Sequence, residues 1–229
     1  MISLAERVNR ARRGNSDIYM PLFLVAAVAS VIGLAACSTS IARKHFMQKL
    51  YAQDSGTKIA YIADSHTIKV IPVENIDKKD ATEYHPRDAS IDALLWTSDG
   101  TSICYLNDIG NFFDTKHQIV KYDLASGNQT VLVDLTKEKF ADNDISELRL
   151  DGQRVFFKLG TGEWYSVRED DPAVKRETKQ ADHDQTKCPH QTYSCFSKTP
   201  SKQSTQIFVG RENQEYSIGN GTKPVWSQK

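Results

Sequence analysis

Four short stretches of the chain alternate apolar side chains with polar or small ones, as strands with one buried face do. Their second residues, Ile59, Ile103, Val155 and Ile207, lie 44, 52 and 52 positions apart. The stretches cover residues 58–62, 102–106, 154–158 and 206–210. Such even spacing predicts four copies of one structural unit of 44 to 52 residues.

Each stretch is followed by a turn and a second strand-like run, which predicts an antiparallel hairpin in every unit. Seven extra residues separate the two runs of the second unit. A third strand-like segment precedes each hairpin. A fourth follows the hairpin, and its strand pattern is clear at 128–133 but weak near 81–84 and 175–179. The second runs are 68–71, 119–122, 164–167 and 216–218, and the third segments are 46–51, 91–96, 145–150 and 193–196.

Four strands per unit predict an all-β fold of about four four-stranded antiparallel blades, a small or partial β-propeller, over residues 51–229. A blade with two apolar faces is not stable alone, so adjacent blades are expected to stack. The pairs Asp99-Gly100 and Asp151-Gly152 lie between the third segment and the hairpin of their units. Tight turns at these places require a positive φ, which glycine adopts without steric cost.

The second unit carries the most specific pattern, with LWTSDGTSICY at 95–105 and IVKYDLASG at 119–127. It resembles a blade of the TolB-like, WD-repeat-like β-propeller family, in which an apolar residue and Trp-Ser-Pro-Asp-Gly precede an apolar strand. The other units keep only the hydrophobic frame. Propellers of that family normally have six or more blades, whereas about four fit here. Residues 224–229 resemble the opening strand of another blade, which either completes the first blade or leaves four blades as an open stack.

The first 36 residues differ in character from the rest. Four arginines precede sixteen uncharged residues, 21–36, which is short for a membrane span of about 20 residues but suits the apolar core of a secretory signal. The sequence Leu34-Ala35-Ala36-Cys37 resembles the bacterial lipobox, which implies cleavage before Cys37 and lipidation of Cys37. Ser38 does not suggest retention at the inner membrane.

We therefore expect a lipoprotein signal peptide at 1–36, a tether at 37–50 and the β-propeller-like domain at 51–229, on the periplasmic face of the outer membrane. An uncleaved single-pass anchor is the alternative. Charged residues make up 25% of the chain and the formal net charge is zero, so we expect no nucleic acid partner.

Motifs of nucleophilic, metal-dependent or phosphate-binding catalysis do not occur in the sequence. We therefore expect no enzymatic activity and no cofactor. The function that we infer is a non-catalytic lipoprotein that binds other proteins within a bacterial envelope assembly. The alternatives are a propeller-type periplasmic enzyme, such as a lyase or a peptidase accessory, and a fragment of a longer propeller.

Cysteines suggest one further feature in the exported part of the chain. Cys188 and Cys195 flank a short loop, and an oxidising compartment would allow them to form a disulfide. The competing interpretation is a zinc site, although the spacing of its ligands matches no common motif. Its ligands would be His183, Cys188, His190 and Cys195. Cys104 lies within an alternating strand and is expected to be a small buried apolar side chain.

Two segments between strands carry aromatic or chargeable side chains that suit contact with a partner. One contains His85 and Arg87, and the other is the insertion of the second unit, with Phe112 and Phe113. The run 142–144 lacks the glycine and the closing glutamate of a calcium loop and is interpreted as a solvated turn.

Overall fold

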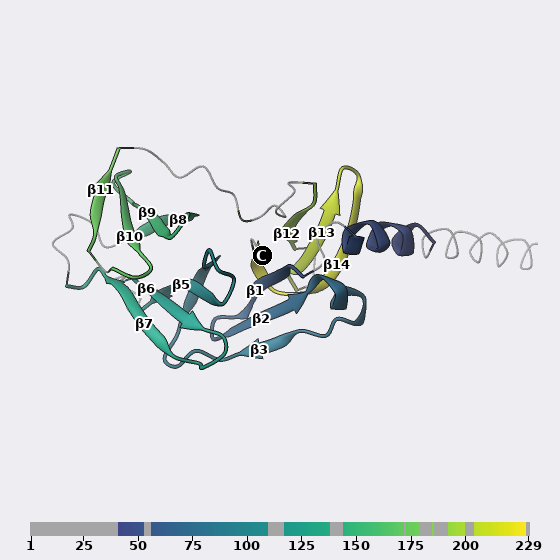
Figure 1. The fold of residues 1–229 in the computed structure, drawn as a ribbon, viewed down its shortest axis with the longest axis horizontal. Helices are drawn as coiled ribbons and strands as arrows, with labels where there is room; N and C mark the ends of the chain where they lie inside the picture. The colour runs from purple at the N-terminus through teal and green to yellow at the C-terminus, as the bar shows by residue number, and fades with distance from the viewer. Residues whose placement is uncertain are drawn as a thin grey trace, which may run out of the picture. The chain divides into compact units, whose positions relative to one another are not determined.

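The computed structural model describes residues 41–52, 56–109, 117–137, 144–171, 173–178, 185, 192–199 and 204–227 (Figure 1). The chain divides into two units, Met1–Lys49 and Leu50–Lys229. The predicted signal peptide, residues 1–36, and the predicted lipidation site Cys37 lie outside the described residues.

Residues 41–52 form a helix, so the prediction of a strand at 46–51 is wrong. Phe46, Met47 and Leu50 are its buried apolar residues, and their spacing is that of one helix face rather than of a strand. Most of the remaining residues of this segment are good helix formers. Among the described residues, no helix combines the length and the apolar character needed to cross a membrane.

Four antiparallel sheets make up the described part of the second unit, which confirms the all-β prediction. We call them sheets 1 to 4. Sheet 1 has the order β15 (Thr222–Trp226), β1 (Lys58–Asp64), β2 (Thr67–Pro72), β3 (Thr82–Tyr84), and a 3-10 helix, η1 (Val73–Lys78), follows β2. Sheet 2 has the order β4 (Ile91–Trp96), β5 (Ser102–Asp108), β6 (His117–Asp123), β7 (Gln129–Asp134).

Sheet 3 repeats the pattern of sheet 2, whereas sheet 4 has three described strands. Sheet 3 consists of β8 (Ile145–Asp151), β9 (Arg154–Leu159), β10 (Trp164–Arg168) and β11 (Lys175–Glu177). Sheet 4 consists of β12 (Ser194–Lys198), β13 (Gln206–Arg211) and β14 (Gln214–Asn220). The four predicted repeat strands are the first five residues of β1, β5, β9 and β13, so the repeat is confirmed.

The last strand, β15, completes the first sheet, which is one of the two outcomes that the sequence left open. Ile59 pairs with Trp226 and Ala60 pairs with Val225. Gly221, with a φ of 153°, links β14 to β15. A Cβ at this position would lie 2.4 Å from the carbonyl oxygen of Ile62, so the close approach of the two backbones requires glycine.

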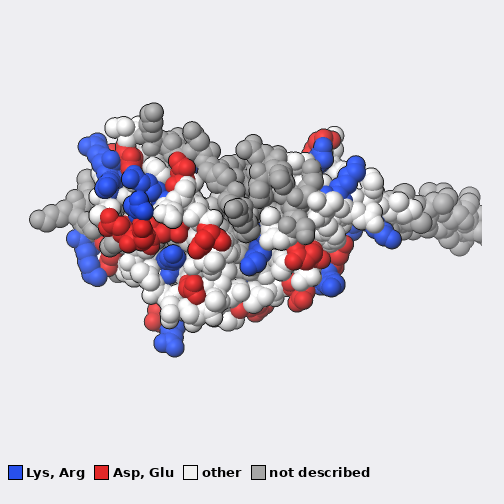
Figure 2. Space-filling model, viewed as in Figure 1, with Lys and Arg blue, Asp and Glu red and all other residues white. Residues whose placement is uncertain are grey.

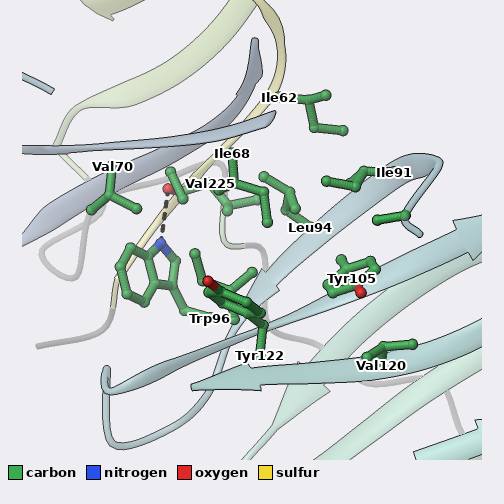
Figure 3. Close-up of a cluster of buried hydrophobic side chains, with 13 residues drawn as sticks. Ile62, Ile68, Val70, Ile91, Leu94, Trp96, Tyr105, Val120, Tyr122 and Val225 are labelled. Carbon is green, nitrogen blue, oxygen red and sulfur yellow. Dashed lines mark hydrogen bonds between the residues drawn. The ribbon is translucent and has the colours of Figure 1, made fainter. Parts of the chain in front are cut away.

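Among the described residues, apolar side chains of sheets 1 to 3 form two cores, with sheet 2 between them. Side chains of sheets 1 and 2 form the first core, where the indole of Trp96 lies among aliphatic residues of both sheets (Figure 3). Ile103 and Tyr105 of β5 belong to this core, whereas Cys104 and Leu106 face the second core, with sheet 3. A strand buried on both faces explains why neighbouring sheets must stack.

Candidate functional site

Antiparallel strands place successive connections at opposite ends of sheets 1 to 3. We call one end the loop end. It carries the β1–β2, β3–β4, β5–β6, β7–β8 and β9–β10 connections. The other is the turn end, with the β2–β3, β4–β5, β6–β7, β8–β9 and β10–β11 connections. The two ends therefore differ in which side chains they can present to a partner.

The predicted contact residues His85 and Arg87 lie at the loop end, in the connection from β3 to β4, and both are exposed. The Nδ1 atom of His85 is 3.3 Å from the hydroxyl of Thr67. Next to it, the Nζ atom of Lys69 lies 2.7 Å from the carboxylate of Glu83. The hydrogen bond from this ammonium lowers the pKa of Glu83, so the carboxylate is ionised at neutral pH.

Hydrogen bonds fix the base of this connection against sheet 1. The backbone N–H of Ile91 donates to the carbonyl of Ser65 at 2.7 Å, and the Nδ1 atom of His66 is hydrogen-bonded to the carbonyl of Ala89. The backbone N–H of His66 donates in turn to the carboxylate of Asp64 and lowers its pKa. The exposed side chains therefore lie on a rigid base rather than on a free loop.

The same connection also meets the start of the β5–β6 loop. The N–H of Ser90 donates to the side-chain oxygen of Asn107 at 2.8 Å, and the N–H of Asp108 donates to the carbonyl of Ser90 at 2.8 Å. Asn107 is buried, whereas Ile109, which follows Asp108, is 41% exposed. The loop that begins here contains Phe112 and Phe113, which lie outside the described residues. The structure thus brings the segment that follows His85 and Arg87 to the end of β5, after which the second predicted segment begins.

The loop end continues from sheet 2 to sheet 3 through His117, the first residue of β6. Its side chain is 6% exposed, and its Nδ1 atom accepts a hydrogen bond from the N–H of Ile145 at 3.1 Å. The N–H of Gly160, in the β9–β10 turn, donates to the carbonyl of Asp144 at 3.1 Å. Hydrogen bonds therefore connect the loop end across three sheets. Sequence reasoning missed His66, Asn107 and His117, because their only signal is a polar side chain at the end of a strand.

The turn end is held by tight turns and buried polar groups. Gly100 and Gly152 have φ values of 68° and 58°, as predicted for the Asp-Gly turns. Gln185 is 4% exposed. Its side-chain oxygen accepts from the N–H of Trp96 at 2.7 Å, its amide nitrogen donates to the carbonyl of Trp96 at 3.1 Å, and its own carbonyl accepts from the N–H of Trp226 at 2.7 Å. One glutamine thus joins β4 to β15.

Glu169 joins sheets 2 and 3 at the turn end. Its carboxylate accepts from the N–H of Ser98 at 3.3 Å and lies 3.7 Å from the Nζ atom of Lys121. Burial raises the pKa of Glu169, and the partial compensation from Ser98 and Lys121 does not cancel that effect. The side chain is 9% exposed, so Glu169 acts within the junction rather than at the surface.

Cys104 is fully buried in β5, as predicted, and burial raises the pKa of its thiol to about 12. It therefore stays protonated and is no nucleophile at neutral pH. Cys195 is buried in β12, while Cys188, His183 and His190 lie outside the described residues. The disulfide and the zinc site stay predictions, as does lipidation at Cys37. Within the residues that the structure places, no group of three or more His, Cys, Asp or Glu side chains could hold a metal ion.

Acidic and basic side chains are intermixed on the face shown in Figure 2, most densely over the region of β6 to β11. Arg154 pairs with Glu177 at 3.1 Å, and Arg168 pairs with Asp170 at 2.8 Å. Such pairs are what a chain with zero net charge is expected to present. The charged side chains on this face therefore form no patch of a single sign that would mark a binding site.

The fold defines the class of the protein as an all-β domain of propeller-type sheets. No family model matches the chain, and no curated protein matches it. Among solved structures, it is similar to TolB from Acinetobacter baumannii, with 19% identity and a TM-score of 0.41 over 72% of this chain and 42% of that chain. It is similar to a putative TolB from Agrobacterium tumefaciens, with 16% identity and a TM-score of 0.37 over 70% of this chain and 64% of that chain.

The chain thus spans less than half of the first TolB and less than two thirds of the second. The tricorn protease is a further similar structure, with 14% identity and a TM-score of 0.36 over 71% of this chain and 16% of that chain. These similarities concern the fold alone.

Proposed function

We propose that the protein is a non-catalytic interaction domain that binds a partner protein through the loop end of sheets 1 to 3. The observation that carries this proposal is the pair of hydrogen bonds between Ser90 and residues 107–108. They join the segment with His85 and Arg87 to the last two residues of β5, which precede the loop with Phe112 and Phe113. Aromatic and arginine side chains are frequent anchors of protein interfaces.

The proposed cellular setting is the periplasmic face of the outer membrane, within a multiprotein envelope assembly. It is supported by the apolar segment at 21–36 and by the lipobox-like residues that end at Cys37. Replacement of Cys37 by alanine is expected to prevent both acylation and cleavage, so the variant should keep its first 36 residues and be larger than the mature wild type. Intact mass of the wild-type protein should show an acylated N-terminal cysteine, and a mature chain that begins elsewhere would contradict the anchor.

Binding is tested with matched variants of the full lipid-anchored protein. A tagged double variant, Arg87→Ala with Phe112→Ala, is expected to lose at least one membrane protein that co-purifies with the wild type after solubilisation. The matched control replaces two exposed residues of the turn end, Gln129→Ala with Asp151→Ala, and is expected to retain that protein. Equal recovery with both double variants would contradict binding at the loop end. Turnover of peptides or oligosaccharides by the purified protein would contradict the absence of catalysis.

A further inference from the structure

One nitrogen atom of His117 faces both a donor, from the first residue of β8, and an acceptor, from the residue just before β8. Its Nδ1 atom lies 3.1 Å from the backbone nitrogen of Ile145 and 3.4 Å from a carboxylate oxygen of Asp144. The donor is buried, whereas the side chain of Asp144 is 57% exposed. Only one of these two groups can be the hydrogen-bond partner of Nδ1 at a time, and the choice depends on where the ring carries its protons.

In the neutral ring, Nδ1 accepts from Ile145 only when the proton is on Nε2. An imidazolium has a hydrogen on both nitrogens, so its Nδ1 can no longer accept. The carboxylate of Asp144 then becomes the matching partner, because it accepts a charge-assisted hydrogen bond. Protonation therefore exchanges a buried bond to the backbone of β8 for a more exposed bond to a side chain, and it leaves the N–H of Ile145 without its acceptor.

The surroundings of His117 favour Asp144 as this second partner. Asp108 lies opposite His117 in the pairing of β5 with β6, and Asp134 ends β7 beside it. Lys137 is 3.0 Å from the carboxylate of Asp134 and neutralises it. Asp144 is the carboxylate whose oxygen lies close to Nδ1 itself.

We propose that His117 makes the junction between sheets 2 and 3 acid-sensitive, so that mild acid releases the first residues of β8 from β6. The corresponding junction between sheets 1 and 2 does not share this property. There the bond from Ile91 to Ser65 joins two backbone groups, and His66 contacts the carbonyl of Ala89. A carbonyl can only accept, so an Nδ1–H of His66 makes this bond in the neutral and in the protonated ring alike.

Release of β8 would also change the loop end as a binding surface, and this consequence rests on the proposed function. The junction itself can be measured without any partner. If acid weakens the junction as expected but the loop end captures no protein, the proposed function is contradicted. The acid-sensitive junction would still stand.

Amide hydrogen exchange of the full lipid-anchored chain in detergent tests the proposal. Protection factors, corrected for intrinsic rates, are compared between a pH of about 7.5 and about 5.5. Fragments that cover the start of β8 are expected to lose about tenfold protection, as the loss of one buried hydrogen bond implies, while fragments of β4 keep theirs. Unchanged protection at the start of β8 would overturn the proposal.

Two variants assign the response to His117. His117→Gln keeps a side-chain acceptor but does not titrate, so its pH response should vanish, whereas the control His66→Gln should keep the wild-type response. If His117→Gln does not fold, Asp144→Asn decides, because loss of the carboxylate should move the response to lower pH. A wild-type response in either His117→Gln or Asp144→Asn would overturn the assignment.

Discussion

The turn end and the loop end of sheets 1 to 3 use polar groups in different ways. At the turn end, the buried Gln185 and the partly buried Glu169 connect neighbouring sheets through the backbone of Trp96 and Ser98. At the loop end, the hydrogen bonds also connect sheets, but exposed side chains such as His85 and Arg87 lie above them. The comparison indicates that the turn end contributes mainly to stability, whereas the loop end combines a rigid base with side chains that are available to a partner.

Replacement of Trp96 by alanine should have the largest effect on stability. Its indole is fully buried between sheets 1 and 2, and its Nε1–H donates to the carbonyl of Val225 at 3.2 Å (Figure 3). Loss of a buried tryptophan costs about 3–5 kcal/mol of unfolding free energy. Urea unfolding should show this loss, with Trp164→Ala, at a half-buried position, as the milder control. A cost below about 1 kcal/mol would show that the two sheets do not share this core.

Replacement of Gln185 by alanine should be the next most damaging change. It removes the partners of the N–H and the carbonyl of Trp96, and unsatisfied buried groups cost about 1–3 kcal/mol each. The matched control is Gln129→Ala, at an exposed position of β7, which should leave the unfolding midpoint unchanged. Equal midpoints for the two variants would mean that Gln185 does not join β4 to β15.

Glu169 and Glu83 should respond to pH with opposite signs. The pKa of Glu169 is raised by burial, so the folded state binds its proton more readily than the unfolded state does. Stability is therefore expected to rise as the pH falls through the raised pKa toward the ordinary value of 4.5, and Glu169→Gln should remove this gain. The variant should also be at least as stable as the wild type at neutral pH.

The pKa of Glu83 is lowered by its hydrogen bond to Lys69, so its small contribution is lost as the pH falls below the ordinary value. The wild type should therefore lose some stability in acid through Glu83, and Glu83→Gln should abolish this loss. Glu169→Gln, by contrast, should abolish a gain. Thermal unfolding of both variants between a pH of about 2.5 and 7 measures the two signs. The same sign for both variants would contradict the contrast between a buried and an exposed carboxylate.

The smallest effect on stability is expected at the loop end. Arg87 is exposed, and a surface substitution changes the unfolding free energy by no more than about 0.5 kcal/mol. Arg87→Ala should therefore unfold like the wild type while its capture of the partner falls. A destabilisation comparable to that of Gln185→Ala would assign Arg87 a structural role instead.

The sequence predicts the parts of this fold that depend on local patterns. Alternation around Ile59, Ile103, Val155 and Ile207 identifies the second strand of each unit, and the Asp-Gly pairs identify the turns. It fails at 46–51, where three apolar residues are too short a pattern to distinguish a strand from a helix face. It also left the partner of β15 open, because pairing across more than 160 residues has no local signal.

The candidate site divides in the same way. His85 and Arg87 are recognisable because chargeable side chains stand out between two strands, and they lie where the strand pattern places them. His117 and Gln185 are not recognisable, because a polar residue that bonds to the backbone of another sheet looks like any other polar residue. Their role depends on which sheets become neighbours, and that is decided by packing of the whole domain.

Photo-crosslinking in native membranes tests most directly whether the loop end is the binding surface. A photoreactive residue is placed in the anchored protein at Arg87 or, as the matched turn-end position, at Asn128, which is also exposed. We predict a discrete adduct with an envelope protein from position 87 and none from position 128. Adducts of equal yield from both positions, or an adduct from position 128 alone, would contradict the assignment of binding to the loop end.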